Sequence, residues 1–258
     1  MENKQISMID VLLETHVGLE RQGPGSPEIT TRALSFVDNL DSGSKIADLG
    51  CGTGGQTMVL AQNITGNIVG VDQFPNFIEK FNDNAEKLNL GGRVNGIVGL
   101  MENLPFGQEE FDLIWSEGAI DNIGFEAGLA YWNGFIKMNG YVAVTCPSWL
   151  TDERPAKVER FWADASSGLD TVAHNIEVMQ KSGYSFVAAF TLPDNCWTDH
   201  YFSPREAAEK AFLQKCPGNK TVEEYIESSK YEMELYSKYK QHYGYVFYIG
   251  KKNEELSK

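Results

Sequence analysis

The chain has 258 residues, of which 42% are hydrophobic and 22% charged, a composition typical of a globular protein with a well-buried core. The chain has 22 Lys and Arg but 36 Asp and Glu. This excess of acidic residues argues against a general affinity for nucleic acid. No apolar run reaches the ~18 residues of a membrane span, no signal-peptide core follows the first residues, and the four cysteines form no C-x-x-C pair. We expect a cytoplasmic protein with reduced thiols and no bound metal.

Two helices are predicted ahead of the first strand. The first covers residues 7–17, and its apolar face would carry Ile6, Ile9, Leu13 and Val17. A loop rich in Gly and Pro follows over 21–27. Ser26 is a good N-cap and Pro27 a good first helical residue, so a second helix is expected to begin there. Its inward residues would be Ile29, Ala33, Val37 and Leu40.

From residue 45 onward, short apolar strands alternate with helices. The predicted strands cover 45–49, 68–72, 94–98, 111–115, 141–145 and 184–190. The predicted helices cover 56–62, 75–88, 126–136, 153–165 and 170–181. Strands that are apolar on both faces and separated by helices indicate a parallel sheet that is covered on both sides.

The C-terminal part of the chain has a different pattern. Aromatic residues are frequent over 191–244, where two helices are expected, the second with Thr221 and Glu224 as a capping box. Residues 245–249 have the composition of a strand. We divide the chain, as one domain, into an N-terminal helix and loop (1–26), a core (27–190), an aromatic insertion (191–244), and a last strand with its tail (245–258).

A glycine-rich turn follows the first strand and begins a helix. Its sequence is Asp48-Leu49-Gly50-Cys51-Gly52-Thr53-Gly54. Alternate glycines let the backbone turn sharply and approach a ligand closely, and the N–H groups at the start of the helix would face that ligand. A turn of this kind is equally compatible with a purely structural role.

Two acids near the turn favour a ligand site. Asp48 stands two residues before the first glycine, and its carboxylate suits a sulfonium or ammonium better than a pyrophosphate. Asp72 ends the second strand, where it would accept hydrogen bonds from both ribose hydroxyls of a nucleoside. The alternative for Asp72 is a helix N-cap.

Over residues 21–145, the sequence resembles the class I S-adenosylmethionine-dependent methyltransferases. The stretch Asp48–Gly54 matches the first motif of that family. The resemblance implies an α/β, doubly wound, Rossmann-like sheet of seven strands, mostly parallel, with an antiparallel last strand inserted between the fifth and sixth. It also implies S-adenosylmethionine as cofactor and S-adenosylhomocysteine as product.

The resemblance also implies which residues hold the cofactor. In the family, the glycine loop wraps the methionine part, the acid that ends the second strand holds the ribose, and the stretch at 99–106 lies along the adenine. The family often has an acid where Leu100 or Met101 stands, so backbone groups are expected to recognise adenine here. The implied residues are Ser26, Asp48, Gly50, Cys51, Gly52, Thr53, Gly54, Asp72, Gln73, Met101, Glu102, Ser116 and Glu117.

The loop at 21–26 resembles a lid found in small-molecule methyltransferases of the sterol, quinone and phosphoethanolamine kind. A lid would fold over the methionine tail and exclude water, whereas a simple linker is the alternative.

Methyl transfer from a sulfonium requires alignment and exclusion of water, and a base only if the acceptor must lose a proton. The candidates for the acceptor pocket are Glu117, Asp121, Asn122, Trp197, His200 and Tyr201. Among these, His200, Tyr201 and Asp121 are the catalytic candidates, with a surface position as the alternative for His200. His16, His174 and His242 have no functional pattern around them.

The predicted function is methyl transfer to a small-molecule acceptor by a monomer or homodimer. A nicotinamide-dependent oxidoreductase is the first alternative, although the spacing G-x-G-x-G differs from G-x-G-x-x-G. A non-catalytic regulator that binds S-adenosylmethionine is the second.

Overall fold

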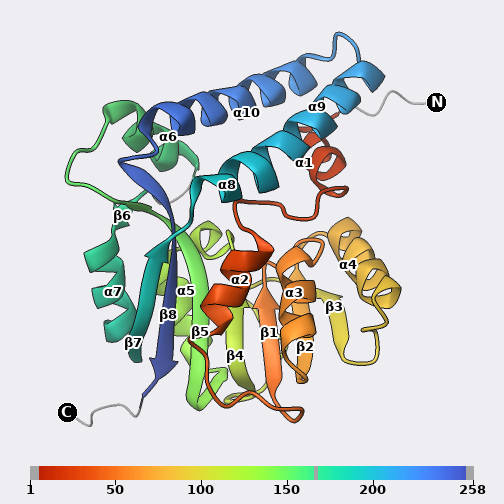
Figure 1. The fold of residues 1–258 in the computed structure, drawn as a ribbon. Coiled ribbons are helices and arrows are strands. Elements are labelled where there is room, and N and C mark those ends of the chain that lie inside the picture. Colours follow the sequence, from red (N-terminus) through yellow and green to blue (C-terminus); the bar gives the residue numbers. More distant parts are fainter. Residues whose placement is uncertain (1–5, 166–167, 254–258) are drawn as a thin grey trace.

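The computed structural model describes residues 6–165 and 168–253. A central sheet carries helices on both faces, and further helices cover one of its ends (Figure 1). The helices are α1 (Met8–His16), α2 (Pro27–Leu34), α3 (Gly55–Asn63), α4 (Pro75–Lys87), η1 (Ile120–Asn122), α5 (Phe125–Asn133), α6 (Ala156–Ala165), α7 (Val172–Lys181), α8 (Asp194–Trp197), η2 (Thr198–Phe202), α9 (Ser203–Lys215) and α10 (Lys220–Tyr239). The strands are β1 (Lys45–Leu49), β2 (Asn67–Asp72), β3 (Val94–Val98), β4 (Phe111–Ser116), β5 (Ile136–Trp149), β6 (Asp170–Thr171), β7 (Tyr184–Thr191) and β8 (Tyr243–Lys252).

The strands lie in the order β3-β2-β1-β4-β5-β8-β7, with the two-residue β6 paired to β5. Only β8 runs antiparallel to its neighbours, β5 and β7. The predicted fold class is therefore confirmed, including the place of the last strand. The chain leaves β1 toward β2 on one side and later returns to β4 on the other. A ligand crevice is expected at this reversal, outside the carboxyl ends of the strands.

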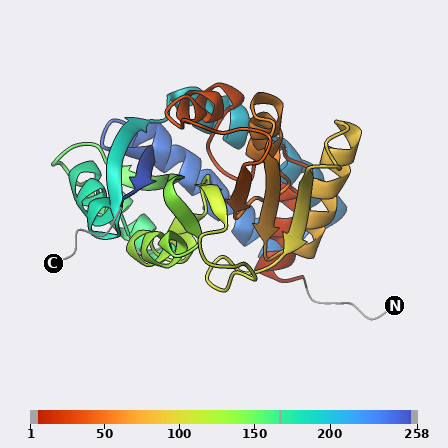
Figure 2. The ribbon, with the colours of Figure 1, turned by 90° about the horizontal axis from the view of Figure 1, so that it is seen from below.

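Alternate strand residues face two separate apolar cores. Ile46 and Leu113 pack with residues of α2, α3 and α4, whereas Ala47 and Ile114 pack with residues of α5 and α7. Seen from below, α2 and α3 lie on one side of the sheet and α5 on the other (Figure 2). Because both faces are covered, the central strands are apolar throughout, as the sequence indicated.

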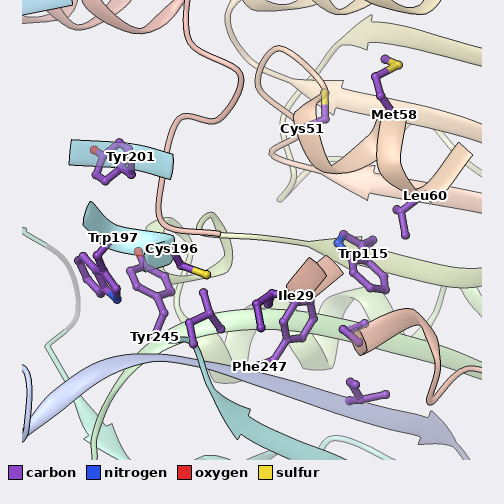
Figure 3. Packing of buried hydrophobic residues seen from close by; sticks show 14 of the residues in the cluster. Ile29, Cys51, Met58, Leu60, Trp115, Cys196, Trp197, Tyr201, Tyr245 and Phe247 are labelled. Carbon is purple, nitrogen blue, oxygen red and sulfur yellow. The ribbon is translucent and has the colours of Figure 1, made fainter. Parts of the chain in front are cut away.

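Helices α1, α6, α9 and α10 form a cap over the carboxyl ends of the parallel strands (Figure 1). Val11 of α1 packs against Val222 and Ile226 of α10. At the base of the cap, Trp197 lies next to Tyr245 of β8, and Ile29 lies next to Phe247 (Figure 3). The cap is therefore joined to the sheet by a continuous apolar core.

Several local predictions differ from the structure. The predicted apolar face of the first helix is wrong at Ile9, which is 58% exposed, because α1 lies on α9 and α10 and so buries Val11; Ile6 of the predicted face does pack with Val11. Ser26 and Pro27 begin α2 as predicted, but the helix ends at Leu34. The capping box is also wrong: Asn219 caps α10, and its side chain accepts a hydrogen bond from the Val222 N–H.

Residues 194–215 form one continuous helical run, α8-η2-α9, with a π-helical segment at η2. Together with α10, this run agrees with the two helices expected there. Within the described ranges 6–165 and 168–253, no helix is both long and apolar enough to cross a membrane.

Candidate functional site

A cavity of about 760 Å³ lies between the carboxyl ends of the strands and the cap. Its floor comes from the loops that follow β1, β2, β3 and β4, and its roof from α1, α6, α9 and α10. The volume is within the range of about 300–1,000 Å³ that is usual for small-molecule sites. The cavity therefore occupies the crevice that the strand order predicts.

The glycine loop after β1 is folded back against the end of β2. The N–H groups of Gly50 and Cys51 donate to the Val71 carbonyl at 2.8 and 3.1 Å. Gly50 and Gly52 have φ of +72° and +54°, a region that side chains disfavour. Gly50, Cys51 and Gly52 all line the cavity, so the loop presents bare backbone to it.

Asp72 joins this loop to the end of β2. Its Oδ2 accepts from the Gly52 N–H at 2.9 Å and its Oδ1 from the Phe74 N–H at 3.0 Å. Phe74, without a capping side chain, is the N-cap of α4, so Asp72 is not the N-cap residue. Burial raises the pKa of Asp72, and the carboxylate lines the cavity beside Gln73. The strand end thus places an acid beside the glycine loop.

Asp48 is fully buried and does not line the cavity. Its Oδ2 accepts from the Thr57 hydroxyl, while its Oδ1 has no hydrogen-bond partner. Burial raises the pKa of Asp48 to about 7. The acid therefore supports the first turn of α3 from behind the loop, and the direct contact with a sulfonium that we expected has no counterpart in the cavity wall.

Four further predicted residues stand behind the wall. The Ser26 side chain caps α2, and Gly54 is the N-cap of α3. The Thr53 hydroxyl donates to the Leu19 carbonyl at 2.9 Å, and the Ser116 hydroxyl donates to the Leu49 carbonyl at 2.7 Å. These four residues shape the loops, whereas Gly50, Cys51, Gly52, Asp72, Gln73, Met101, Glu102 and Glu117 line the cavity.

Residues 17–26, which we call the strap, cross the glycine loop. The Gln22 amide bonds Thr53 twice: Oε1 accepts from the Thr53 N–H at 2.9 Å, and Nε2 donates to the Thr53 hydroxyl at 2.9 Å. A Cβ on Gly52 would lie 2.0 Å from Gln22 Oε1. Nothing in the local sequence pattern identified Gln22, because its partner is 31 residues away.

A buried ion pair holds the strap to the end of β4. Arg21 Nη1 lies 2.7 Å from Glu117 Oε2, with side-chain exposures of 4% and 3%. The other carboxylate oxygen of Glu117 accepts from the Thr30 hydroxyl at 2.7 Å and from Trp115 Nε1 at 2.9 Å. Glu117 therefore both lines the cavity and fastens the strap.

The loop after β3 forms the opposite end of the floor. Leu100, Met101 and Glu102 line the cavity there. The Met101 carbonyl accepts from Trp132 Nε1 at 2.9 Å, and this contact with a buried residue of α5 fixes the loop. At position 101 the wall thus has a methionine in place of an acid, with Glu102 next to it.

In the roof, Arg205 of α9 is 3% exposed. It donates to Glu232 Oε2 at 2.6 Å, to the Tyr201 hydroxyl at 2.9 Å and to the Ser229 carbonyl at 3.1 Å. His16, around which no sequence pattern indicated a function, also lines the cavity. Burial lowers the pKa of His16 to about 4.

The structure separates the candidates for the acceptor pocket. Tyr201, Asp121 and Asn122 line the cavity, whereas His200 and Trp197 do not. Trp197 is fully buried and stacks on Tyr236 with ring centroids 4.2 Å apart. The aromatic at 197 therefore packs the cap against the sheet.

Comparisons with known proteins agree with this arrangement. A family model described as "Methyltransferase domain" matches residues 40–191, more than half of the chain. The erythromycin 3''-O-methyltransferase of Saccharopolyspora erythraea is 33% identical over 84 residues, which are 32% of this chain and 28% of that protein. The sterol 24-C-methyltransferase of Candida albicans is 30% identical over 104 residues, which are 39% of this chain and 28% of that protein. The chain thus matches less than a third of the length of either relative.

Solved structures share the fold over nearly the whole chain. A methyltransferase from Thiobacillus denitrificans in complex with S-adenosylhomocysteine has a TM-score of 0.81 at 18% identity, covering 95% of this chain and 99% of that one. Its counterpart from Geobacter sulfurreducens, also in complex with S-adenosylhomocysteine, has a TM-score of 0.80 at 17% identity, covering 93% and 96%. With the family model matched over the core that carries the glycine loop and Asp72, the chain belongs to the methyltransferase-domain family.

Proposed function

We propose that the protein transfers a methyl group from S-adenosylmethionine to a small-molecule acceptor. The observation that carries this proposal is the meeting of the Gly50–Gly52 backbone and the Asp72 carboxylate in one cavity wall, in a chain of this family. When bound, S-adenosylmethionine supplies an electrophilic methyl group on a positively charged sulfur. The net charge of -14 supports a small-molecule acceptor rather than nucleic acid. A cytoplasmic location stays a prediction.

Each part of the cavity floor fits one part of this cofactor. Asp72 would accept from the ribose hydroxyls, as carboxylates at the end of a second strand do. The backbone of the glycine loop at Gly50–Gly52, which lines the cavity, would lie against the methionine part. The wall at Leu100–Glu102 would lie along the adenine.

The strap supplies the exclusion of water that an in-line displacement needs. Gln22 ties it to the glycine loop, Arg21 ties it to Glu117, and the Gly25 N–H donates to the Cys196 carbonyl at 3.3 Å. These bonds to three separate parts of the protein support a lid over the methionine tail, rather than a linker.

Binding and turnover together test the proposal. Calorimetry should show that S-adenosylmethionine and S-adenosylhomocysteine bind and that NAD does not, and a methyl-transfer assay on a panel of metabolites should then give turnover. Binding of NAD instead would favour the oxidoreductase. Binding of both adenosyl compounds without turnover of any acceptor would favour a regulator.

Asp72→Ala should weaken S-adenosylhomocysteine binding by about 2–3 kcal/mol, because two charge-assisted hydrogen bonds to the ribose are lost. Asp72→Asn is the matched control, since its oxygen can still accept from the Gly52 N–H, and it should lose less. Calorimetry on both variants measures the effect. An unchanged affinity for Asp72→Ala would remove the ribose contact from the proposal.

His200→Ala and Tyr201→Phe should differ in turnover, although the residues are adjacent. Tyr201 lines the cavity and its hydroxyl accepts from Arg205, whereas His200 lies outside the wall. Tyr201→Phe should lower methyl transfer about tenfold, equal to about 1.4 kcal/mol in the barrier, with normal S-adenosylhomocysteine binding. His200→Ala should leave turnover unchanged. A loss confined to His200→Ala would restore His200 as the base.

A further inference from the structure

The cavity wall is rich in carboxylates. Among the residues that the structure describes, five acids line it, Asp72, Glu102, Glu117, Asp121 and Glu232, and the cations in the wall are Arg21 and Arg205. His16 adds no positive charge at neutral pH, because burial lowers its pKa to about 4. The potential inside the cavity is therefore negative before any ligand enters.

Both guanidinium groups are already paired. Arg21 is bound by Glu117 at 2.7 Å within the floor. Arg205 is bound by Glu232 at 2.6 Å and lies 3.5 Å from Glu209. A phosphate or carboxylate would have to displace one of these acids, so among the described residues of the wall no uncompensated cation is left for an anionic acceptor.

Three acids of the described wall have no such partner: Asp72, Glu102 and Asp121. Asp72 already accepts from two backbone N–H groups and Glu102 is exposed, which leaves Asp121. It lies in η1, directly after β4, and its Oδ1 is buried and accepts no hydrogen bond.

The ionisable groups that interact with Asp121 are Cys146 of β5 and Tyr245 of β8. Asp170 acts on Cys146 as well, and Tyr201 and Glu232 act on Tyr245. Burial raises the pKa of both the Cys146 thiol and the Tyr245 hydroxyl, so both are neutral. Burial also raises the pKa of Asp121 to about 6, which suits a proton acceptor at neutral pH.

Aromatic rings also line the cavity. Phe161 and Trp162 of α6, Tyr201, Tyr225 and Tyr245 line it. A cation is held well by ring faces together with a carboxylate. The cavity wall therefore has the two features that recognise an ammonium group.

Resting on the proposed function, we propose that the acceptor is a small amine, cationic in solution, whose ammonium pairs with Asp121. An ammonium nitrogen has no lone pair, so one N–H bond must break first, and the Asp121 carboxylate takes the proton. The freed lone pair then forms the bond to the methyl carbon, while the sulfur–methyl bond breaks and its electron pair stays on sulfur. The products are a methylated ammonium and a neutral thioether.

Three probes test the charge preference: tyramine, tyrosol and 4-hydroxyphenylacetate. They share one phenol ring, and the short chain attached to it ends in an amine, a hydroxyl and a carboxylate respectively. Binding to the complex with S-adenosylhomocysteine is measured first, and then methyl transfer from S-adenosylmethionine. Tyramine should bind at least tenfold more tightly than either analogue and should be methylated on nitrogen. Equal or tighter binding of tyrosol or 4-hydroxyphenylacetate, or no methylation of tyramine, overturns the proposal.

Asp121→Asn should reduce amine methylation at least 100-fold and leave S-adenosylhomocysteine affinity unchanged. The variant should regain activity as the pH rises toward the amine's own pKa of about 10, since water then removes the proton. Glu126→Gln, which removes an exposed acid nearby, is the control and should behave as wild type. Unchanged activity of Asp121→Asn, or no recovery at high pH, contradicts the proton transfer. If the unsubstituted protein does not bind S-adenosylhomocysteine, that result would instead contradict the proposed function itself.

Discussion

Gly52→Val is expected to lower S-adenosylhomocysteine affinity more than about 100-fold, equal to about 2.7 kcal/mol. Gly52 has φ of +54°, and a Cβ there would lie 2.0 Å from Gln22 Oε1. The new side chain must therefore move the strap from the glycine loop or distort the loop itself. Calorimetry measures the loss. Gly92→Val is the matched control, because a Cβ on Gly92 meets nothing within 4 Å.

A second variant distinguishes a clash with the strap from a clash with the ligand as the cause of the lost affinity. Gln22→Ala combined with Gly52→Ala removes the amide that a Cβ at position 52 would meet. If the clash with the strap causes the loss, this double variant should bind more tightly than Gly52→Ala alone. If the ligand itself needs the space, the two variants should bind equally weakly. A folded Gly52→Val protein with wild-type affinity would contradict both explanations and the assignment of the loop.

Glu117→Ala is expected to lower the free energy of unfolding by about 3–5 kcal/mol, the usual loss when one partner of a buried ion pair is removed. Arg21 is 4% exposed on its side chain, so its charge would be left without compensation. Urea denaturation measures the change. Glu110→Ala is the control, since the pair of Glu110 with Lys45 has side-chain exposures of 30% and 54% and should contribute less than about 1 kcal/mol.

The double variant R21M/E117Q removes both charges. It should be more stable than Glu117→Ala, because neither partner is then left charged inside the protein. A loss for Glu117→Ala no larger than that for Glu110→Ala would show that the strap is not held by this pair.

Much of the core could be predicted from the sequence because its signals are local. The strands from 45 to 145 are apolar on both faces, and only covered parallel strands need that pattern. The glycines at 50, 52 and 54 and the acid at the end of β2 stand at fixed distances along the chain from the strands that carry them. For such residues, the position in the element determines the position in space, and both Gly52 and Asp72 line the cavity.

The roof of the cavity was decided by the tertiary structure. From their positions in the sequence, Trp197, His200 and Tyr201 were equally good candidates for the acceptor pocket. Of these three only Tyr201 lines the cavity, because the π-helical segment at η2 sets which side chains face inward. His16, Arg205 and Glu232 come from three helices that share no sequence pattern.

Their meeting depends on how α1, α9 and α10 pack on one another. The sequence by itself therefore determined the family, the order of the sheet and the glycine loop and Asp72 in the floor of the cavity. The tertiary structure alone decided the strap contacts and the charges in the roof of the cavity, because pairs such as Gln22 with Thr53 and Arg21 with Glu117 join residues 31 and 96 positions apart, where no local periodicity can relate them.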